Sequence, residues 1–311
     1  MQYDSAGDPI SGLRWTHRTR SSLADYLGSI GLRISATSVG TLLKKMGFSL
    51  RLNQKKIQGG KKTAQNQKER DEQFGYIRSM RDRFDSRLLP VISVDTKKKE
   101  LIGNFKNNGV TWCRSAEAVN DHDFPSQSQG KAIPYGVYDV RNNTGIVNVG
   151  VTHDTPQFAA DSIEKWWRCE GKKRYPQAKH LLILADNGGS NASDSNVWKY
   201  ALYKKLCMVY GITVSVCHYP TGASKWNPIE HRFFSEISKN WEGVPLRNLE
   251  IVLKYIRTTK TKTGLKIRAF LNKKKYKTGE KITKENVSGI NMKYHKTLPK
   301  WNYTIKPENV K

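Results

Sequence analysis

The sequence predicts an α/β protein whose sheet mixes antiparallel and parallel strands, preceded by a helical segment. Between residues 90 and 250, short apolar runs alternate with amphipathic helical patterns, which is typical of an α/β sheet. Residues 1–89 instead carry apolar residues at helical spacing, flanked by capping residues. The hydrophobic fraction of 37% is sufficient for a core, so we expect a folded protein rather than a disordered chain.

Two short helices are predicted near the N-terminus. Ser22 can cap a helix that ends at Gly28, and Ser35 can cap a second helix that ends at Gly47. This pattern is typical of a helix-turn-helix, although an ordinary helical hairpin has it too. The apolar residues expected on the inner side of the second helix are Val39, Leu42, Leu43 and Met46. The outward residues, which suit a recognition helix on DNA, are Thr37, Ser38, Thr41, Lys44 and Lys45.

The segment after these helices, residues 48–62, is basic and ends in two glycines, which is compatible with a wing. Residues 63–86 then show a charged helical pattern with Phe74, Ile77 and Met80 inward. The predicted domains are a helix-turn-helix region at 1–62, a linker helix at 63–89, an α/β domain at 90–250 and a basic C-terminal extension at 251–311.

The α/β domain shows three strands first and then helices alternating with strands. Residues 142–144 are a short connection, which predicts an antiparallel hairpin between the second and third strands. The predicted elements are strands at 90–95, 131–140 and 145–152, a helix at 155–169, a strand at 180–186, a helix at 196–210, a strand at 212–217 and a helix at 227–241. This is the order of the ribonuclease H-like fold, in which three antiparallel strands are continued by parallel ones.

Three carboxylates are expected to meet at one edge of this sheet. Asp95 ends the first strand and Asp186 ends the fourth, and these strands lie side by side in the predicted order. Glu230 falls at the third position of a helix that has Asn227 as its expected N-cap and Pro228 as its first residue. The positive end of the helix dipole helps to keep a carboxylate there ionised.

Crowded, ionised carboxylates repel one another unless cations neutralise them. Oxygen ligands of this kind select Mg²⁺ or Mn²⁺, and two such ions about 4 Å apart can assist an in-line phosphoryl transfer. Each residue also has a structural alternative. Glu230 can close a capping box, and either aspartate can be a turn residue at a strand end. Asp139 and Asp154 are rival carboxylates, and the predicted fold puts Asp139 at the wrong strand end.

The charge of the chain favours a polyanionic partner. With 54 Lys and Arg against 27 Asp and Glu, the formal net charge is +27. Residues 1–90 hold 17 basic and 8 acidic residues and residues 251–311 hold 17 and 3, whereas the middle holds 20 and 16. Basic flanks around a balanced domain indicate an enzyme bracketed by nucleic-acid contacts, the alternative being solvated basic surfaces.

Other features are negative or weak. The apolar runs fall far short of the roughly 20 residues of a membrane helix. The four cysteines lack metal-site spacing, which favours reduced thiols in a cytosolic protein. Residues 265–271 alternate between apolar and basic side chains, which predicts a half-buried strand with one basic face. The lysines at 273–277 are either phosphate contacts or a solvated run.

The motifs together resemble the DDE transposases of bacterial insertion sequences, in the Rhodopirellula-type family, a relative of the mariner-like superfamily. The resemblance covers about residues 7–307. It is carried by VDTKKKE with GNF (94–105), IPYGVYD (133–139), VG with HDT (149–155), AD with GGSN (185–191), SKWN with IEHR (224–232) and WNYTI (301–305).

The resemblance implies that Asp95, Asp186 and Glu230 form the triad that binds Mg²⁺ or Mn²⁺, as two ions. It implies cleavage of double-stranded DNA at terminal inverted repeats by water, then strand transfer into target DNA by the freed 3′-hydroxyl. A homodimer in the synaptic complex and a bacterial cytoplasmic location, with the nucleoid when DNA-bound, are expected on this basis. Family members usually carry more chain ahead of Gly7, so this chain is expected to be short at that end. Members of this family more commonly have Asn-Lys at the position where this chain has Asn227-Pro228.

Further residues near the site are weighed by position. The residues expected to contact DNA because they flank the triad are Lys97, Lys98, Lys225, Trp226 and Arg232. Asp121 and His122 look metal-binding but fall in a predicted loop, and His231 is favoured as a packing or supporting residue. Two other functions remain open: a catalytically silent DNA-binding protein that occupies element ends, and a ribonuclease H-like nuclease acting on RNA or hybrids.

Overall fold

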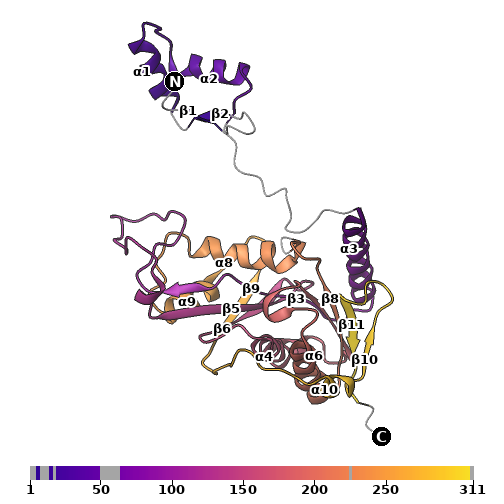
Figure 1. Cartoon of the computed structure of the whole chain (residues 1–311). Helices are drawn as coiled ribbons and strands as arrows, with labels where there is room; N and C mark the ends of the chain where they lie inside the picture. Colours follow the sequence, from indigo (N-terminus) through magenta and orange to yellow (C-terminus); the bar gives the residue numbers. More distant parts are fainter. Residues whose placement is uncertain (1–4, 8–13, 17–18, 50–63, 224–225, 309–311) are drawn as a thin grey trace. The chain divides into compact units, whose positions relative to one another are not determined.

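The computed structural model of the chain describes residues 5–7, 14–16, 19–49, 64–223 and 226–308 (Figure 1). The contacts divide the chain into two compact units, residues 1–58 and 59–311, and each is described by itself. Lys225 and nearly all of the predicted wing lie outside the described residues.

The first unit contains the two predicted helices, α1 (Arg20–Ser29) and α2 (Ala36–Lys45), and a small hairpin that the sequence pattern did not predict. The hairpin pairs β1 (Ser5–Gly7) with β2 (Arg14–Thr16). Helix α1 begins earlier than expected, because Thr19 rather than Ser22 is its cap and accepts a bond from the Ser22 amide at 3.1 Å. Ser35 caps α2 as predicted.

The five residues expected to face outward from α2 are all exposed, which agrees with their predicted orientation. The inner side is narrower than predicted. Val39 is buried and Leu43 half-buried, but Leu42 and Met46 are 48% and 69% exposed. Among the described residues α2 packs on α1, and one neighbouring helix covers only a narrow stripe of the surface of another.

The second unit is built on a sheet with the strand order β10-β11-β8-β7-β3-β5-β6-β9, in which β4 also pairs with β5. Its strands are β3 (Val91–Thr96), β4 (Glu100–Ile102), β5 (Gly130–Asp139), β6 (Thr144–Gly150), β7 (His180–Ala185), β8 (Thr213–His218), β9 (Lys266–Asn272), β10 (Met292–Tyr294) and β11 (Asn302–Ile305). Strands β3, β5 and β6 are antiparallel, and β3, β7 and β8 are parallel. The predicted ribonuclease H-like order is therefore confirmed.

Helices cover both faces of this sheet (Figure 1). Ile183 on β7 packs against α4 and α6, whereas its neighbours Leu182 and Leu184 pack against α3, because successive strand residues point to opposite faces. One face carries α4 (Pro156–Trp166), α6 (Asn196–Leu202) and α10 (Lys284–Ser288). The other carries α3 (Ala64–Asp85), α8 (Ser235–Asn240) and α9 (Leu249–Thr258). The short helices α5 (Lys172–Arg174) and α7 (Met208–Tyr210) follow π-helical segments at Trp167–Gly171 and Tyr203–Cys207.

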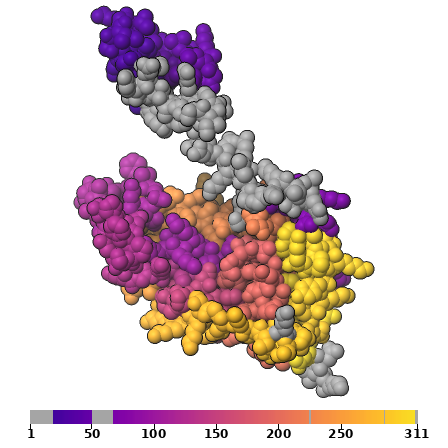
Figure 2. Space-filling model, viewed as in Figure 1, coloured from indigo at the N-terminus to yellow at the C-terminus, as the bar shows by residue number. Residues whose placement is uncertain are grey.

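The C-terminal residues are part of the sheet, which corrects the expectation of an extension beginning at 251. Strand β9 pairs in parallel with β6 at one edge, and β11 pairs with β8 at the other. Leu265, Ile267 and Ala269 are buried while Lys266 and Arg268 are exposed, as the alternation predicted. In the space-filling view the C-terminal residues, in yellow, cover one side of this unit (Figure 2).

The structure also describes three further features considered in the sequence, namely membrane helices, the cysteines and the loop that holds Asp121 and His122. In the described part of the chain, no helix is both long enough and apolar enough to span a bilayer. All four cysteines are free thiols, with Cys207 and Cys217 buried, Cys169 half-buried and Cys113 exposed. Asp121 and His122 lie in the predicted loop between β4 and β5, and both are exposed.

Candidate functional site

Asp95 and Asp186 meet at one edge of the sheet. Strands β3 and β7 run in parallel with Val94 opposite Ala185, so the next residue of each chain is an aspartate at the same level. Asp95 is 7% exposed, and its carboxylate accepts a bond from the Thr96 amide at 2.7 Å. The predicted pairing of the two strand ends is therefore what brings these carboxylates together.

Glu230 reaches the same edge from the helix that begins at Pro228. This helix is anchored to β3 by the buried Asn227, whose side-chain amide donates to the Val94 carbonyl at 3.2 Å and accepts a bond from the Ser93 hydroxyl. Ser93 in turn accepts a bond from the Ile229 amide at 3.1 Å. Asn227 thus does not use its side chain as the predicted N-cap, because that side chain is bound to β3.

A glycine allows this helix to approach the sheet closely. Gly136 lies on β5 directly opposite Asp95. A Cβ atom at Gly136 would lie 2.6 Å from the Phe234 ring and 2.7 Å from Ile229, both on the helix that carries Glu230. The helix is also wound as a π-helix from Glu230 to Phe234, where the sequence predicted regular α-helix. Such π-helical turns are frequent at functional sites.

The electrostatics show that the three carboxylates are close. Burial is the main cause that raises the pKa of Asp95 well above its ordinary value, and the charges of Asp186 and Glu230 raise it further. Burial also raises the pKa of Asp186 to about 6, with added repulsion from Glu230 and Asp154 and an opposing hydrogen bond from Asn191. The site is therefore an acidic cluster in which each added negative charge is unfavourable.

Asp154 is a fourth carboxylate at this edge, and sequence reasoning left it only as a rival. It accepts a bond from the Thr96 hydroxyl at 3.1 Å and lies 3.9 Å from the Lys99 ammonium. A signal was available in the predicted hairpin. The third strand returns in the direction of the first, so the residues after it arrive at the edge that holds Asp95.

The donor set is chemically suited to a hard divalent cation, since it consists of carboxylate oxygens. Within the described ranges, no group of three His, Cys, Asp or Glu side chains converges as a ready-made metal site. The fit therefore rests on donor chemistry and on the raised pKa of Asp95 and Asp186, because a bound cation would relieve the repulsion that raises them.

Two hydrogen-bond chains hold Asp186, and sequence reasoning assigned neither. Tyr135 donates to the Asn191 side chain at 2.8 Å, and Asn191 donates to the Asp186 carboxylate at 3.3 Å. On the other side, His218 Nδ1 lies 3.0 Å from the Asp186 carbonyl and Nε2 lies 3.1 Å from the Tyr303 hydroxyl. A carbonyl only accepts, so Nδ1 carries the proton. Burial lowers the pKa of His218 to about 4, which keeps the ring neutral.

The residues expected to contact DNA beside the triad differ in how exposed they are. Lys97 is 8% exposed, forms an ion pair with Glu100 at 2.8 Å and lies over the Trp241 ring, which argues against the predicted contact. Lys98 and Trp226 are exposed. Arg232 is exposed too, but it lines a separate hollow of about 320 Å³.

The other acidic candidates lie apart from the cluster. Asp139 pairs with Ile92, near the start of β3, so it lies at the opposite strand end as the fold predicted. It is fully buried and accepts bonds from Tyr175 and Arg174. Asp121 and His122 are 3.8 Å apart and contact each other in the exposed loop, while His231 is exposed beside Glu230.

The family model described as Rhodopirellula transposase DDE domain matches residues 1–307. No curated protein matches the chain. Solved structures that resemble it include the Mos1 transposase paired-end complex with the left transposon end, at 15% identity and a TM-score of 0.47 over 77% of this chain and 65% of that one. The Mos1 mariner paired-end complex with Mn gives 15% and 0.48 over the same shares. The chain thus covers less than two thirds of the length of these Mos1 chains.

Proposed function

Because the chain belongs to the Rhodopirellula transposase DDE domain family, we propose that it is a DNA transposase that cleaves element ends and joins them to target DNA. The observation that carries this proposal is the meeting of Asp95, Asp186 and Glu230 at one edge of a ribonuclease H-like sheet. The formal net charge of +27 supports a polyanionic substrate. We expect Mg²⁺ or Mn²⁺ as the cofactor, as two ions.

In this proposal the three carboxylates hold the metal, and the remaining residues fix their positions. Bound divalent cations supply a Lewis acid and an activated nucleophile for in-line phosphoryl transfer. Asn191 orients the Asp186 carboxylate, and His218 holds the backbone carbonyl of the same residue. Asn227 holds the start of the helix that carries Glu230. Buried partners of this kind limit the freedom of the ligands before substrate arrives.

DNA recognition is proposed for the exposed outer face of α2, with additional contacts from Lys98 and Trp226 near the cluster. The exposed polar residues at the start of α2 and the lysines at its end suit a helix in the major groove. A homodimer is proposed because two element ends must be held together during joining.

The direct test supplies linear duplex DNA that carries the terminal repeats of the element, with and without Mg²⁺ or Mn²⁺. We expect strand nicking at the repeat ends only with the metal, and no preference for an RNA–DNA hybrid of the same sequence. A shift of the DNA without nicking would instead support the silent DNA-binding protein. Preferred cleavage of the hybrid would support the nuclease.

A second prediction concerns stability and pH. The pKa of Asp95 and of Asp186 is raised in the folded state, so protonation of either group contributes stability below the unfolded pKa of about 4. For Asp186 this contribution is lost as the pH rises through about 6, and for Asp95 it is lost as the pH rises through its own raised pKa. A divalent cation binds the ionised carboxylates of the folded protein. At saturating Mg²⁺ we therefore expect the melting temperature to rise by about 5 °C at pH 7.5 and by much less at pH 5.

The control for this measurement is Asp186→Asn, which should remove most of the rise at pH 7.5. A monovalent salt at equal ionic strength should not reproduce it, because the effect depends on coordination rather than screening. An equal rise at both pH values, or an undiminished rise in Asp186→Asn, would contradict metal binding at this cluster.

A further inference from the structure

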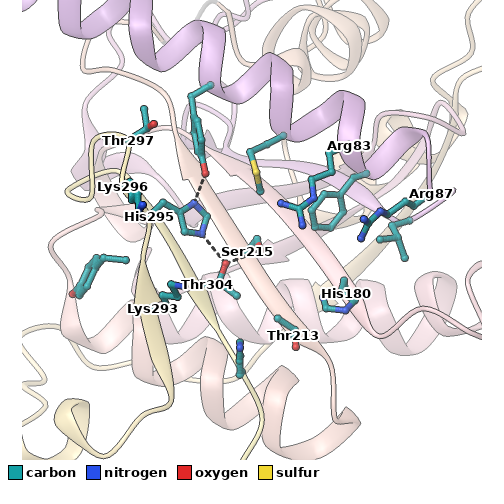
Figure 3. Close-up of a pocket in the computed structure, with 16 residues that line it drawn as sticks. Arg83, Arg87, His180, Thr213, Ser215, Lys293, His295, Lys296, Thr297 and Thr304 are labelled. Carbon is teal, nitrogen blue, oxygen red and sulfur yellow. Dashed lines mark hydrogen bonds between the residues drawn. The ribbon is translucent and has the colours of Figure 1, made fainter.

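A second hollow lies on the α3 face of the sheet, away from the acidic cluster. Its volume is about 490 Å³, and it is bounded by α3 on one side and by β8, β11 and β10 on the other (Figure 3). His180 and Thr213, which begin β7 and β8, line it. Asp186 follows the other end of β7, so the part of the hollow at His180 lies about 20 Å from the cluster along the strand. One phosphate cannot reach both.

Among the residues that the structure describes, the hollow is lined by five cations, if its histidines are left aside, and by no acid. They come from α3 and the turn after it, from β10, and from the residues that follow β10 and β11, and they are Arg83, Arg87, Lys293, Lys296 and Lys306. All five are exposed, and within residues 64–223 and 226–308 none of them forms an ion pair. Figure 3 shows Arg83 of α3 and Arg87, which follows α3, across the opening from Lys293 and Lys296. Cations gathered in a concavity without counter-charge attract an anion strongly, because the field is focused there.

A chain of hydrogen-bonded hydroxyl and imidazole groups lies in the hollow, together with apolar side chains of α3 such as Met80 and Phe84. Tyr76 bonds to His295 Nδ1 at 2.7 Å, His295 Nε2 to the Thr304 hydroxyl at 2.7 Å, and Thr304 to the Ser215 hydroxyl at 2.8 Å (Figure 3). Burial lowers the pKa of His295, and the charges of Lys293 and Arg83 lower it further. The lowered pKa of His295 therefore reflects, in part, the positive charges of these cations.

We propose that this hollow binds a phosphodiester segment of DNA, as a second DNA contact apart from the reacting phosphate. The proposal rests on the proposed function for the identity of the polyanion. The opening favours a polymer over a small phosphorylated molecule, because the cations stand exposed at the rim, whereas small-ligand sites enclose most of the surface of their ligand. Backbone contacts of this kind position DNA without reading its sequence.

The test measures the affinity of the full chain for a linear duplex of mixed sequence, without metal, over a series of salt concentrations. The variant Lys293→Gln/Lys296→Gln removes two exposed charges from the hollow. The matched control Lys172→Gln/Lys173→Gln removes two exposed lysines from α5, on the opposite face, which form no ion pair with any other described residue. We expect the first variant to bind about tenfold more weakly near 0.1 M salt, with the slope of log K against log salt reduced by about 2, and the control to change little. Equal losses in both variants, or none in the first, would overturn the proposal.

A protection experiment distinguishes DNA from a free phosphorylated molecule. Lys293 and Lys296 are acylated with and without ligand and quantified by mass spectrometry, using the same duplex or inorganic tripolyphosphate as the probe. We expect the duplex to protect both lysines. Protection by tripolyphosphate and not by duplex would assign the hollow to a small phosphorylated molecule and overturn the proposal. These assays contain no metal, so failure here leaves the nicking test intact, and failure to nick leaves these results intact.

Discussion

Asp95→Asn, Asp186→Asn and Glu230→Gln are each expected to reduce the rate of metal-dependent nicking by at least about 10³-fold. Each substitution keeps the shape of the side chain and removes one negative charge from the proposed metal ligands. The measurement is single-turnover nicking of terminal-repeat DNA at saturating Mg²⁺. DNA affinity without metal should stay within about twofold of the original protein, because phosphate contacts come from other residues.

The stability of the same three variants is expected to change in the opposite direction to their activity. This difference would exclude misfolding as the cause of the lost nicking. Burial and mutual repulsion raise the pKa of Asp95 and Asp186, so removing one charge should leave the metal-free protein at pH 7.5 as stable as before or more stable. The amides can still accept the bonds from Thr96 and Asn191. Loss of nicking together with an unchanged or higher melting temperature would point to chemistry.

Asp139→Asn is the matched control, since Asp139 is a buried carboxylate at the other end of the sheet. This substitution weakens the bonds that Tyr175 and Arg174 donate to residue 139. It should lower the free energy of unfolding by about 1–3 kcal/mol. Nicking measured below its melting temperature should remain near the original rate. If Asp139→Asn lost nicking as the triad variants do, or if all three triad variants retained it, the assignment of the cluster would be wrong.

The sheet order and the meeting of three carboxylates could be predicted because both depend on local pattern. Apolar runs mark the strands, and Asp95 and Asp186 stand where two such runs end. To predict the position of Asp154, the direction of the strand before it must be considered as well. The partners of Asp186 were beyond local pattern. His218 and Tyr303 come from β8 and β11, 85 positions apart in the chain, and only the pairing of those strands brings them together.

Local pattern also does not show which distant elements pack together, and this explains the predictions that differ from the structure. Leu42 and Met46 have helical spacing, but spacing does not tell how many neighbours cover a helix. The pattern of residues 265–271 predicted a half-buried strand correctly, yet it did not indicate that this strand would join the sheet beside β6. Lys97 lies two positions after Asp95 in the chain, but its placement is decided by its contacts with the ring of Trp241 and the carboxylate of Glu100.

Asn227→Ala is expected to reduce nicking by about 10²-fold without altering any proposed metal ligand. The Asn227 amide joins the helix start to β3 through Val94 and Ser93. Without it, the buried Val94 carbonyl and Ser93 hydroxyl each lose a partner, and the helix that carries Glu230 is free to shift. A displacement of about 1 Å at a reacting centre can cost about a hundredfold in rate.

The stability of this variant should fall as well, by about 2–4 kcal/mol, because the bonds lost are buried. Asn148→Ala is the control for that effect. Asn148 is 1% exposed on β6, two strands away from β3, and donates to the Ser162 hydroxyl at 2.9 Å. The two variants should be destabilised to a similar degree, but only Asn227→Ala should lose nicking when both are assayed well below their melting temperatures.

The rise in melting temperature with Mg²⁺ distinguishes a displaced Glu230 from a general loosening of the fold. If Asn227 acts by holding Glu230 against Asp95, its removal should diminish the Mg²⁺-dependent rise at pH 7.5, whereas Asn148→Ala should keep it. An undiminished rise together with normal nicking in Asn227→Ala would show that the bonds to β3 stabilise the helix without positioning the carboxylate. Ser93→Ala, which removes one of the same bonds, should give an intermediate loss in both measurements, because the Val94 contact of Asn227 remains.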